Sequence, residues 1–306
     1  MRKQTKWSSS RLLDGFQAYL REVCGLSPKT CSNYTDYTCR FLRGKYGDGT
    51  IEIRDLRADD LIAFITEQSC RYKPGTLQII TAALRSLIRF LQMKGSCDGR
   101  LVYAVPGVAN WRLSSLPVGL GEDQLPVLLK SFDRSRATGL RDYAMVECMA
   151  TLGLRVGEVA GLSLDDIDWR TGVVQLPKRK ARHGNVLPLP PSVGQAIADY
   201  LRHGRLKTAE RRIFVCHRFR IGDALGVLSA KTAIGRALKR AGITPGPSGS
   251  HILRHTAATR MLRNGATLKE IADVLGHRRI ETTAIYAKVD LKALAEVALP
   301  WPEVRQ

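Results

Sequence analysis

The chain has 306 residues, of which 44% are apolar, so it is long and apolar enough for two domains with cores of their own, and global disorder is excluded. Its 48 Lys and Arg residues exceed its 28 Asp and Glu residues, which gives a formal net charge of +20 at pH 7. This excess predicts a polyanionic partner. Nucleic acid is favoured over an anionic membrane surface, because the basic residues run along the whole chain instead of forming a terminal tail.

Membrane insertion, secretion and a zinc or disulfide framework are all disfavoured. No apolar run approaches the roughly 18 residues that a membrane helix needs, and no apolar core follows the basic N-terminal residues. The seven cysteines include no C-x-x-C pair. We therefore expect a reduced, cytoplasmic protein without a membrane partner.

The first third of the chain contains four amphipathic helical patterns. They cover residues 8–23, 27–47, 57–68 and 73–95. The second pattern begins with Ser27-Pro28, a capping residue followed by a proline at the first helical position. Four helices of this size form one compact unit, so we expect a helical domain at residues 1–100 and a Gly- and Pro-containing linker at 101–117.

The remaining chain predicts helices around a small β region. Helical patterns cover 120–132, 141–162, 191–205, 229–242, 251–265 and 268–276. Apolar residues at 173–176 and 186–189 flank a polar turn, which predicts a β-hairpin. The expected fold is mainly α with a small antiparallel β-sheet. A helical domain precedes an α+β domain at 118–290, and residues 291–306 form a tail helix.

Two arginine motifs indicate an anion site. In His251-Ile-Leu-Arg254 the two polar side chains share a helix face, and the preceding loop supplies a Ser cap at Ser250 and free backbone N–H groups. In GLRVGEV, Arg155 lies in an otherwise apolar helix and needs a partner or a ligand, and Glu158 can hold it. Taken alone, each motif also fits a structural role: a core histidine with a surface arginine, or an Arg155–Glu158 pair.

Two further motifs lie in the hairpin and near the C-terminus. The hairpin tip, residues 177–184, reads PKRKARHG and can reach into a nucleic-acid groove. Leu275-Gly276-His277 is followed nine residues later by Tyr286. Taken alone, the tip fits a solvated turn, His277 a capping or core histidine, and Tyr286 a packed aromatic residue.

Together these motifs resemble the tyrosine recombinase (phage integrase) family in their order and spacing. The resemblance covers nearly all of residues 118–290, and the helical first part looks like the family's core-binding, SAM-like DNA-binding domain. It implies an enzyme, a site-specific recombinase that cleaves and rejoins DNA strands through a 3′-phosphotyrosine intermediate. The implied context is integration, excision or transposition of a mobile element, with no cofactor, metal or ATP.

The resemblance also implies a role for each motif residue. Tyr286 is the nucleophile, and Arg155 and Arg254 bind the non-bridging phosphate oxygens. His251 and His277 add hydrogen bonds or move the proton of the nucleophile. A hairpin lysine protonates the leaving 5′-oxygen. Counting back from Pro188 favours Lys180, and Lys178 remains the alternative, while Glu158 and His255 are expected to support the others.

The implied partner is double-stranded DNA, held between the two domains as in a clamp. The helix at 229–242 carries Lys231, Arg236, Lys239 and Arg240 and is expected to lie against the DNA. The tail at 291–306 either docks on a neighbouring protomer in a synaptic tetramer or packs on its own domain. Two other functions remain open: a type IB topoisomerase-like relaxase, and a non-catalytic, sequence-specific DNA-binding protein of the same fold.

Overall fold

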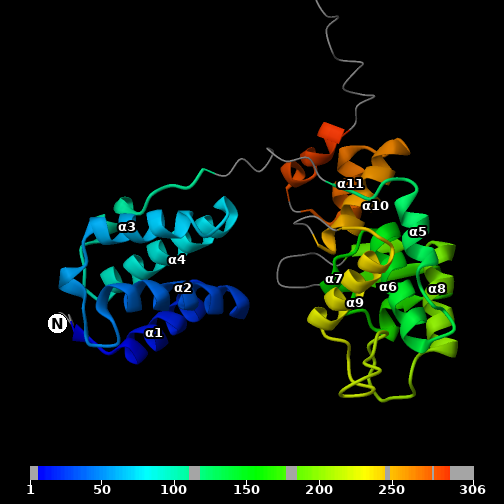
Figure 1. The fold of residues 1–306 in the computed structure, drawn as a ribbon, viewed down its shortest axis with the longest axis horizontal. Coiled ribbons are helices and arrows are strands. Elements are labelled where there is room, and N and C mark those ends of the chain that lie inside the picture. The colour runs from blue at the N-terminus through cyan, green and yellow to red at the C-terminus, as the bar shows by residue number, and fades with distance from the viewer. Residues whose placement is uncertain (1–5, 110–117, 177–184, 245–248, 278, 290–306) are drawn as a thin grey trace, which may run out of the picture. The chain divides into compact units, whose positions relative to one another are not determined.

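The computed structural model describes residues 6–109, 118–176, 185–244, 249–277 and 279–289. The chain divides into two compact units, Met1–Arg112 and Leu113–Gln306, which Figure 1 colours from blue to green and from green to red. The described residues are mainly helical and include small antiparallel sheets, so the predicted fold class is confirmed. No helix in these described ranges has the length and apolar character needed to cross a membrane.

The first unit is a helical bundle with a two-stranded sheet. Its elements are β1 (Lys6–Trp7), α1 (Ser9–Ala18), a π-helical turn (Tyr19–Val23), α2 (Pro28–Tyr46), β2 (Ile51–Glu52), α3 (Ala58–Ser69) and α4 (Pro74–Met93). The side chains of Ser8 and Ser27 accept backbone N–H bonds at the starts of α1 and α2. Pro28 follows at the first position of α2, where its missing N–H costs nothing.

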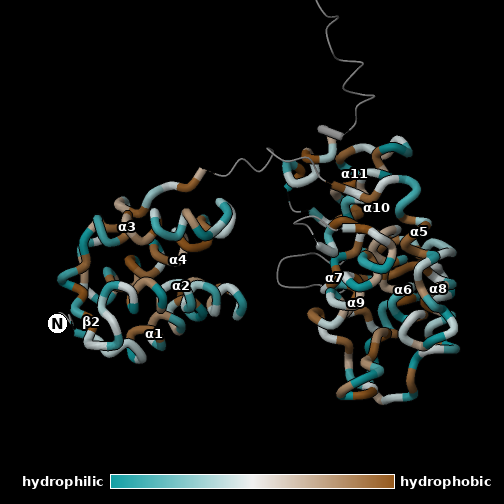
Figure 2. The backbone as a smooth tube through the Cα atoms, in the orientation of Figure 1, coloured by the Kyte–Doolittle hydropathy of each residue, from teal (hydrophilic) through white to brown (hydrophobic). Residues whose placement is uncertain are grey.

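The core of the first unit is centred on α4. Its apolar residues recur three and four apart, so Ile80, Leu84, Leu87 and Leu91 are all fully buried, and long hydrophobic stretches follow this helix in Figure 2. Residues beyond α4 pack on the same core. Val105 is buried there, and Arg85 Nη2 donates to the carbonyl oxygens of Val105 and Pro106 at 3.0 and 3.1 Å.

The second unit is built around α6. Its helices are α5 (Gln124–Lys130), α6 (Ala137–Leu152), α7 (Val156–Val159), α8 (Pro191–His203), α9 (Val227–Arg240), α10 (His251–Arg263) and α11 (Leu268–Leu275). Short 3-10 segments follow at Ile280–Thr282 and Ala284–Val289. Helix α6 is buried at every position from Ala144 to Leu152 except Thr151, and it contacts α8, α9 and α10 (Figure 1), as expected of a central helix.

A three-stranded antiparallel sheet flanks these helices. Its strands are β3 (Ile167–Asp168), β4 (Val173–Leu176) and β5 (Asn185–Pro188), in that order. Val174 is paired with Leu187 and Leu176 with Asn185, so the predicted hairpin is confirmed. Its tip, residues 177–184, lies outside the described residues.

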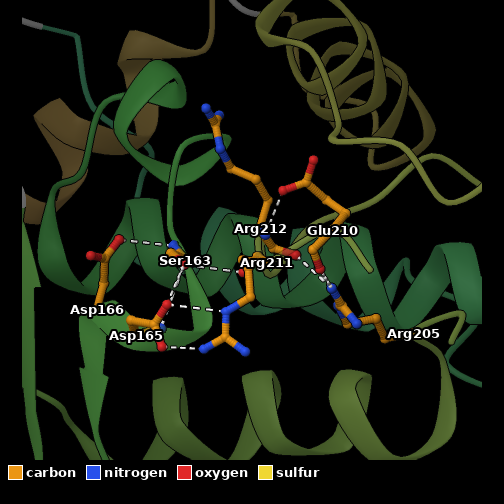
Figure 3. Close-up of polar contacts among 7 residues, drawn as sticks. All are labelled: Ser163, Asp165, Asp166, Arg205, Glu210, Arg211 and Arg212. Carbon is orange, nitrogen blue, oxygen red and sulfur yellow. Dashed lines mark hydrogen bonds and ion pairs between the residues drawn. The ribbon is translucent and has the colours of Figure 1, made fainter. Parts of the chain in front are cut away.

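A polar network fixes the segment that leads from α8 to α9 (Figure 3). The guanidinium of Arg205 donates to the backbone oxygens of Glu210, Arg212 and Ile213 at 2.5, 2.9 and 3.1 Å. Arg211 forms an ion pair with Asp165, and Ser163 Oγ donates to the Arg211 carbonyl at 3.1 Å. The network holds this irregular segment against the turn before β3.

The helix predicted at 141–162 is interrupted. Helix α6 ends at Leu152, and Gly153 adopts the left-handed conformation (φ 65°) that commonly closes a helix. A Cβ atom at Gly153 would lie 2.4 Å from Leu275 Cδ2. The expectation that Arg155 lies inside a continuous apolar helix is therefore wrong, because Arg155 starts a new short helix.

Candidate active site

Arg155 is the N-cap residue of α7. Its backbone is extended (φ −74°, ψ 148°). The backbone N–H donates to Glu158 Oε2 at 2.8 Å, and Nη1 donates to Glu158 Oε1 at 3.1 Å. One carboxylate thus caps the helix and orients the guanidinium. The Arg155 side chain is 35% exposed, so it is oriented yet accessible to a ligand.

Arg254 is buried in α10 and contacts two other segments. Its Nη1 donates to the Gly153 carbonyl and its Nη2 to the Leu275 carbonyl, each at 2.6 Å. These bonds use two of the five guanidinium N–H groups. Burial, with a smaller effect of Arg155, lowers the pKa of Arg254 to about 10, so the side chain remains charged at pH 7.

His251 occupies the first position of α10 and is exposed. Partial desolvation, followed by the charges of Arg254 and Arg155, lowers its pKa. Both arginines therefore lie close to this ring, as the shared helix face predicts for Arg254. The expected Ser cap is wrong: Ser250 has a helical backbone, and its side chain makes no capping bond.

His277 follows the C-terminus of α11. Gly276 ends that helix in the left-handed conformation (φ 58°), and the His277 N–H donates to the Ala272 carbonyl at 2.8 Å. The ring Nδ1 is 2.7 Å from Thr283 Oγ1. Burial, followed by the charges of Arg254 and Arg155, lowers the pKa of His277 to about 4, so the ring is neutral at pH 7.

Tyr286 is both a packed aromatic residue and a neighbour of these cations. Its side chain is 1% exposed and packs in a small core with Ala258, Ile271 and Leu275. Its Oη is 2.9 Å from His255 Nδ1. Burial raises the pKa of Tyr286, and the charges of Arg254 and Arg155 act in the opposite direction.

The base of the hairpin is tied to α11. Lys178 and Lys180 lie outside the described residues, so the structure does not distinguish between them. Asn185, the first described residue after the tip, donates from Nδ2 to the carbonyls of Asp273 and Val274 at 2.9 and 3.2 Å. Arg254 binds the next carbonyl, that of Leu275. The last turn of α11, which precedes His277, is thus held from two directions.

The four basic residues of α9 are all exposed, and they have different neighbours. Lys231 contributes to the lowered pKa of His251 and therefore lies on the side of the site. Arg236 and Arg240 instead influence the carboxylate of Asp142, and the Arg240 guanidinium lies 5.7 Å from the centre of the Phe132 ring. The expectation that this helix lies against DNA stays a prediction.

Among the described residues, no group of three His, Cys, Asp or Glu side chains is arranged to hold a metal ion. The charged groups around Tyr286 are instead the guanidinium groups of Arg155 and Arg254. Such a site suits an anionic ligand with several oxygen atoms, since guanidinium groups bind phosphate oxygens through paired N–H donors.

Two family models match the chain. The phage integrase family model matches residues 119–292, and the model of the phage integrase N-terminal SAM-like domain matches residues 13–95. The chain belongs to the phage integrase family. It is a DNA strand-transfer enzyme, a tyrosine recombinase of the site-specific type, and the recognition made from its motifs is confirmed.

Relatives support this assignment along nearly the whole chain. A putative integrase/recombinase, y4rA of Sinorhizobium fredii, is 44% identical over 291 residues, which is 95% of this chain and 70% of the relative. The tyrosine recombinase XerD of Listeria monocytogenes is 31% identical over 297 residues, 94% of this chain and 96% of the relative.

Solved structures share the fold at low sequence identity. XerH bound to a palindromic difH substrate, in a post-cleavage complex, has a TM-score of 0.74 at 17% identity, and the match covers 96% of this chain and 97% of XerH. A lambda integrase tetramer bound to a Holliday junction has a TM-score of 0.72 at 18% identity, and the match covers 93% of this chain and 78% of the integrase.

Sequence reasoning gave too little weight to three residues beside the site. His255 was expected to play a supporting part, yet it contacts the tyrosine hydroxyl directly. Thr283 and Asn185 were not singled out, although they bind His277 and α11. The second histidine of the H-x-x-R-H motif was a sequence signal for the contact between His255 and Tyr286. Nothing in the local sequence pointed to the other two.

Proposed function

We propose that this recombinase cleaves double-stranded DNA by attack of Tyr286 Oη on a backbone phosphate. The attack would give a 3′-phosphotyrosine and a free 5′-hydroxyl. The observation that carries the proposal is a shared pair of cations, because the charges of Arg155 and Arg254 act on Tyr286, on His251 and on His277. Arg254 is also bonded to the Leu275 carbonyl, in the segment that leads to His277. Separate structural roles for these residues would not require them to share one place.

The two arginines are assigned to the phosphate. Cleavage builds negative charge on the non-bridging oxygens, and fixed cations aimed at that charge lower the barrier most. Arg155 and Arg254 are oriented in advance by Glu158 and by two carbonyl groups. His251 and His277, held neutral by their surroundings, can each donate one N–H to the same oxygens.

Leaving-group protonation is assigned to a hairpin lysine, Lys180, with Lys178 as the alternative. No step of this scheme needs a metal ion, because the arginines supply the positive charge. No step needs ATP, because the phosphotyrosine conserves the energy of the phosphodiester bond for rejoining. Tyr286 is 1% exposed, so DNA binding must uncover its hydroxyl before attack.

The wider context is proposed from the relatives. Integration, excision or transposition of a mobile element, by a tetramer on DNA in the cytoplasm, agrees with the integrase/recombinase y4rA and with the lambda integrase tetramer on a Holliday junction. Residues 291–306 are proposed to dock on a neighbouring protomer in that tetramer. If a chain truncated after Lys288 assembled normally on DNA, this docking would be excluded.

Covalent trapping tests the proposed chemistry. Wild type, Tyr286→Phe and, as a control, the exposed Tyr103→Phe are mixed with nicked duplexes that tile the DNA flanking the chain's own gene. Wild type and Tyr103→Phe should form a DNA–protein adduct that survives denaturation, whereas Tyr286→Phe should bind DNA without forming it. An adduct with Tyr286→Phe would contradict the assignment. Binding without any adduct would favour the non-catalytic alternative.

A further inference from the structure

We propose that His255 is the proton acceptor for Tyr286, a catalytic role for the second histidine of the H-x-x-R-H motif. The inference rests on the proposed function, in which Tyr286 attacks the phosphate. It assigns the step that this function leaves open, namely where the phenolic proton goes.

The geometry selects His255 among the histidines around the site. Its Nδ1 lies 2.9 Å from Tyr286 Oη, within the range for direct proton transfer. The two rings are 5.7 Å apart and tilted by 59°. Nδ1 of His277 is occupied by Thr283 Oγ1 at 2.7 Å. Among the described residues, the side chain that hydrogen-bonds the tyrosine hydroxyl is that of His255.

The surroundings of His255 keep it ready to accept a proton. Partial burial, then the neighbouring His251 and Arg254, lower its pKa, so the ring is neutral at pH 7. His277 is also close, since His255 contributes to its lowered pKa. A neutral ring with its proton on Nε2 presents the lone pair of Nδ1 to the hydroxyl of Tyr286.

The same cations make proton transfer depend on the substrate. Without DNA, burial and then the neighbouring His251 and Arg254 disfavour an imidazolium at His255. A bound phosphate brings negative charge among these groups, which makes the neighbouring imidazole more basic. The phosphate also disfavours a free phenolate beside it. Binding of the phosphate therefore has two effects at once. Tyr286 needs a base to remove its proton, and His255 becomes basic enough to accept it.

The step balances in both directions. The bond between Tyr286 Oη and phosphorus forms, the bond between phosphorus and the 5′-oxygen breaks, and the phenolic proton passes to His255 Nδ1. The 5′-oxygen receives its proton from the hairpin lysine of the proposed function. In rejoining, the 5′-hydroxyl attacks phosphorus and returns its proton to the hairpin lysine. The bond between phosphorus and Tyr286 Oη breaks, and the departing tyrosine oxygen recovers its proton from His255.

Single-turnover cleavage of a nicked duplex that wild type cleaves tests the inference. His255→Ala should lower the rate of adduct formation by at least about 100-fold, the usual range for losing a general base. Its DNA affinity and unfolding midpoint should stay close to wild type. Added imidazole should restore part of the rate in proportion to its concentration. His203→Ala, a change at an exposed histidine of α8, is the matched control.

Two further measurements separate proton transfer from other roles. His255→Asn can accept a hydrogen bond from Tyr286 but cannot take its proton, so it should remain as slow as His255→Ala. A duplex with a bridging 5′-sulfur has a leaving group that needs no protonation, and it should not rescue either variant. Full activity of His255→Asn would reduce His255 to a positioning residue, and rescue by sulfur would make it the leaving-group acid.

The outcomes distinguish this inference from the function on which it rests. An adduct that requires Tyr286 but forms at the wild-type rate in His255→Ala would overturn the inference alone. A slow His255→Ala variant that imidazole does not rescue, with a lowered unfolding midpoint, would overturn it as well. An adduct that still forms in Tyr286→Phe, or no adduct with wild type on any duplex, would overturn both.

Discussion

The hydroxyl of Thr283 controls how His277 faces a ligand. It is fully buried and lies 2.7 Å from His277 Nδ1, which fixes the orientation of the ring and leaves Nε2 for the phosphate of the proposed reaction. We expect Thr283→Val to slow adduct formation about tenfold, since losing a buried hydrogen-bond partner costs about 1–3 kcal/mol. Thr283→Ser keeps the hydroxyl and should stay near the wild-type rate. Equal rates for the valine and serine variants would show that this bond is irrelevant to cleavage.

Several histidines should make the second unit sensitive to acid. The pKa values of His217, His251, His255 and His277 are all lowered in the fold, chiefly by burial, and that of His277 falls to about 4. A histidine in the unfolded chain titrates near 6.5, so protons bind the unfolded state more readily below that value. Stability should therefore be fully present above about pH 6.5 and fall as pH drops toward about 4.

Urea unfolding of the full chain at about pH 7.5 and about pH 5 measures this linkage. The urea midpoint of the second unit should be lower at about pH 5 than at about pH 7.5. This difference between the two midpoints should be smaller in His277→Gln. A transition that is the same at both pH values in wild type would contradict the lowered histidine pKa values.

At the scale of elements, the break between α6 and α7 depends on Gly153. Its positive φ is unfavourable for other residues, and a Cβ atom would lie 2.4 Å from Leu275 Cδ2. Gly172 has the same φ of 65° but open space around it. We expect Gly172→Ala to cost about 1 kcal/mol of unfolding free energy. Gly153→Ala should cost more and also slow cleavage, because moving Leu275 displaces a carbonyl that Arg254 binds. Equal losses of unfolding free energy in the two variants would mean that the Leu275 side chain moves away from the added Cβ atom at no cost.

The hairpin base and α11 are joined by Asn185. Its two bonds to α11 carbonyls place the start of β5 beside the segment that carries His277. Asn185→Ala should slow cleavage about five- to tenfold with DNA affinity little changed, since each lost bond is worth about 1 kcal/mol. Gln175→Ala, at an exposed position of β4, should have little effect. Single-turnover adduct formation measures both variants, and a wild-type rate for Asn185→Ala would show that the hairpin is held by other contacts.

Local signals could be predicted from the sequence, whereas the contacts that build the site could not. The Ser27-Pro28 start of α2 and the hairpin strands follow from capping and periodicity, which act within a few residues. The bonds from Arg254 to Gly153 and from Asn185 to Asp273 join residues 101 and 88 positions apart. Such pairings depend on how the helices pack, and no pattern in one segment encodes them. The motif residues were found because the family resemblance supplied that long-range information.

At the scale of the whole molecule, the two units have separate hydrophobic cores. The expected domains, 1–100 and 118–290 with the linker 101–117 and the tail 291–306, remain a prediction. Residues 1–112 and 113–306 expressed separately should each unfold cooperatively. Each should bind DNA more weakly than the full chain and with a shallower dependence on salt, because each makes only part of the phosphate contacts. A fragment that aggregates or unfolds without a transition would show that the units depend on each other.

The two bonds from Arg254 to backbone carbonyls affect which mutations can accumulate in a copy of this gene that is no longer under selection for recombination. Substitution of this arginine leaves the Gly153 and Leu275 carbonyls without their buried hydrogen-bond donor. Such a substitution therefore destabilises the fold even in a copy that no longer needs to recombine DNA. Tyr286 can become phenylalanine without that penalty to the backbone. A degenerate relative that retains the arginine and lacks the tyrosine is therefore expected to be a folded protein that no longer cuts DNA.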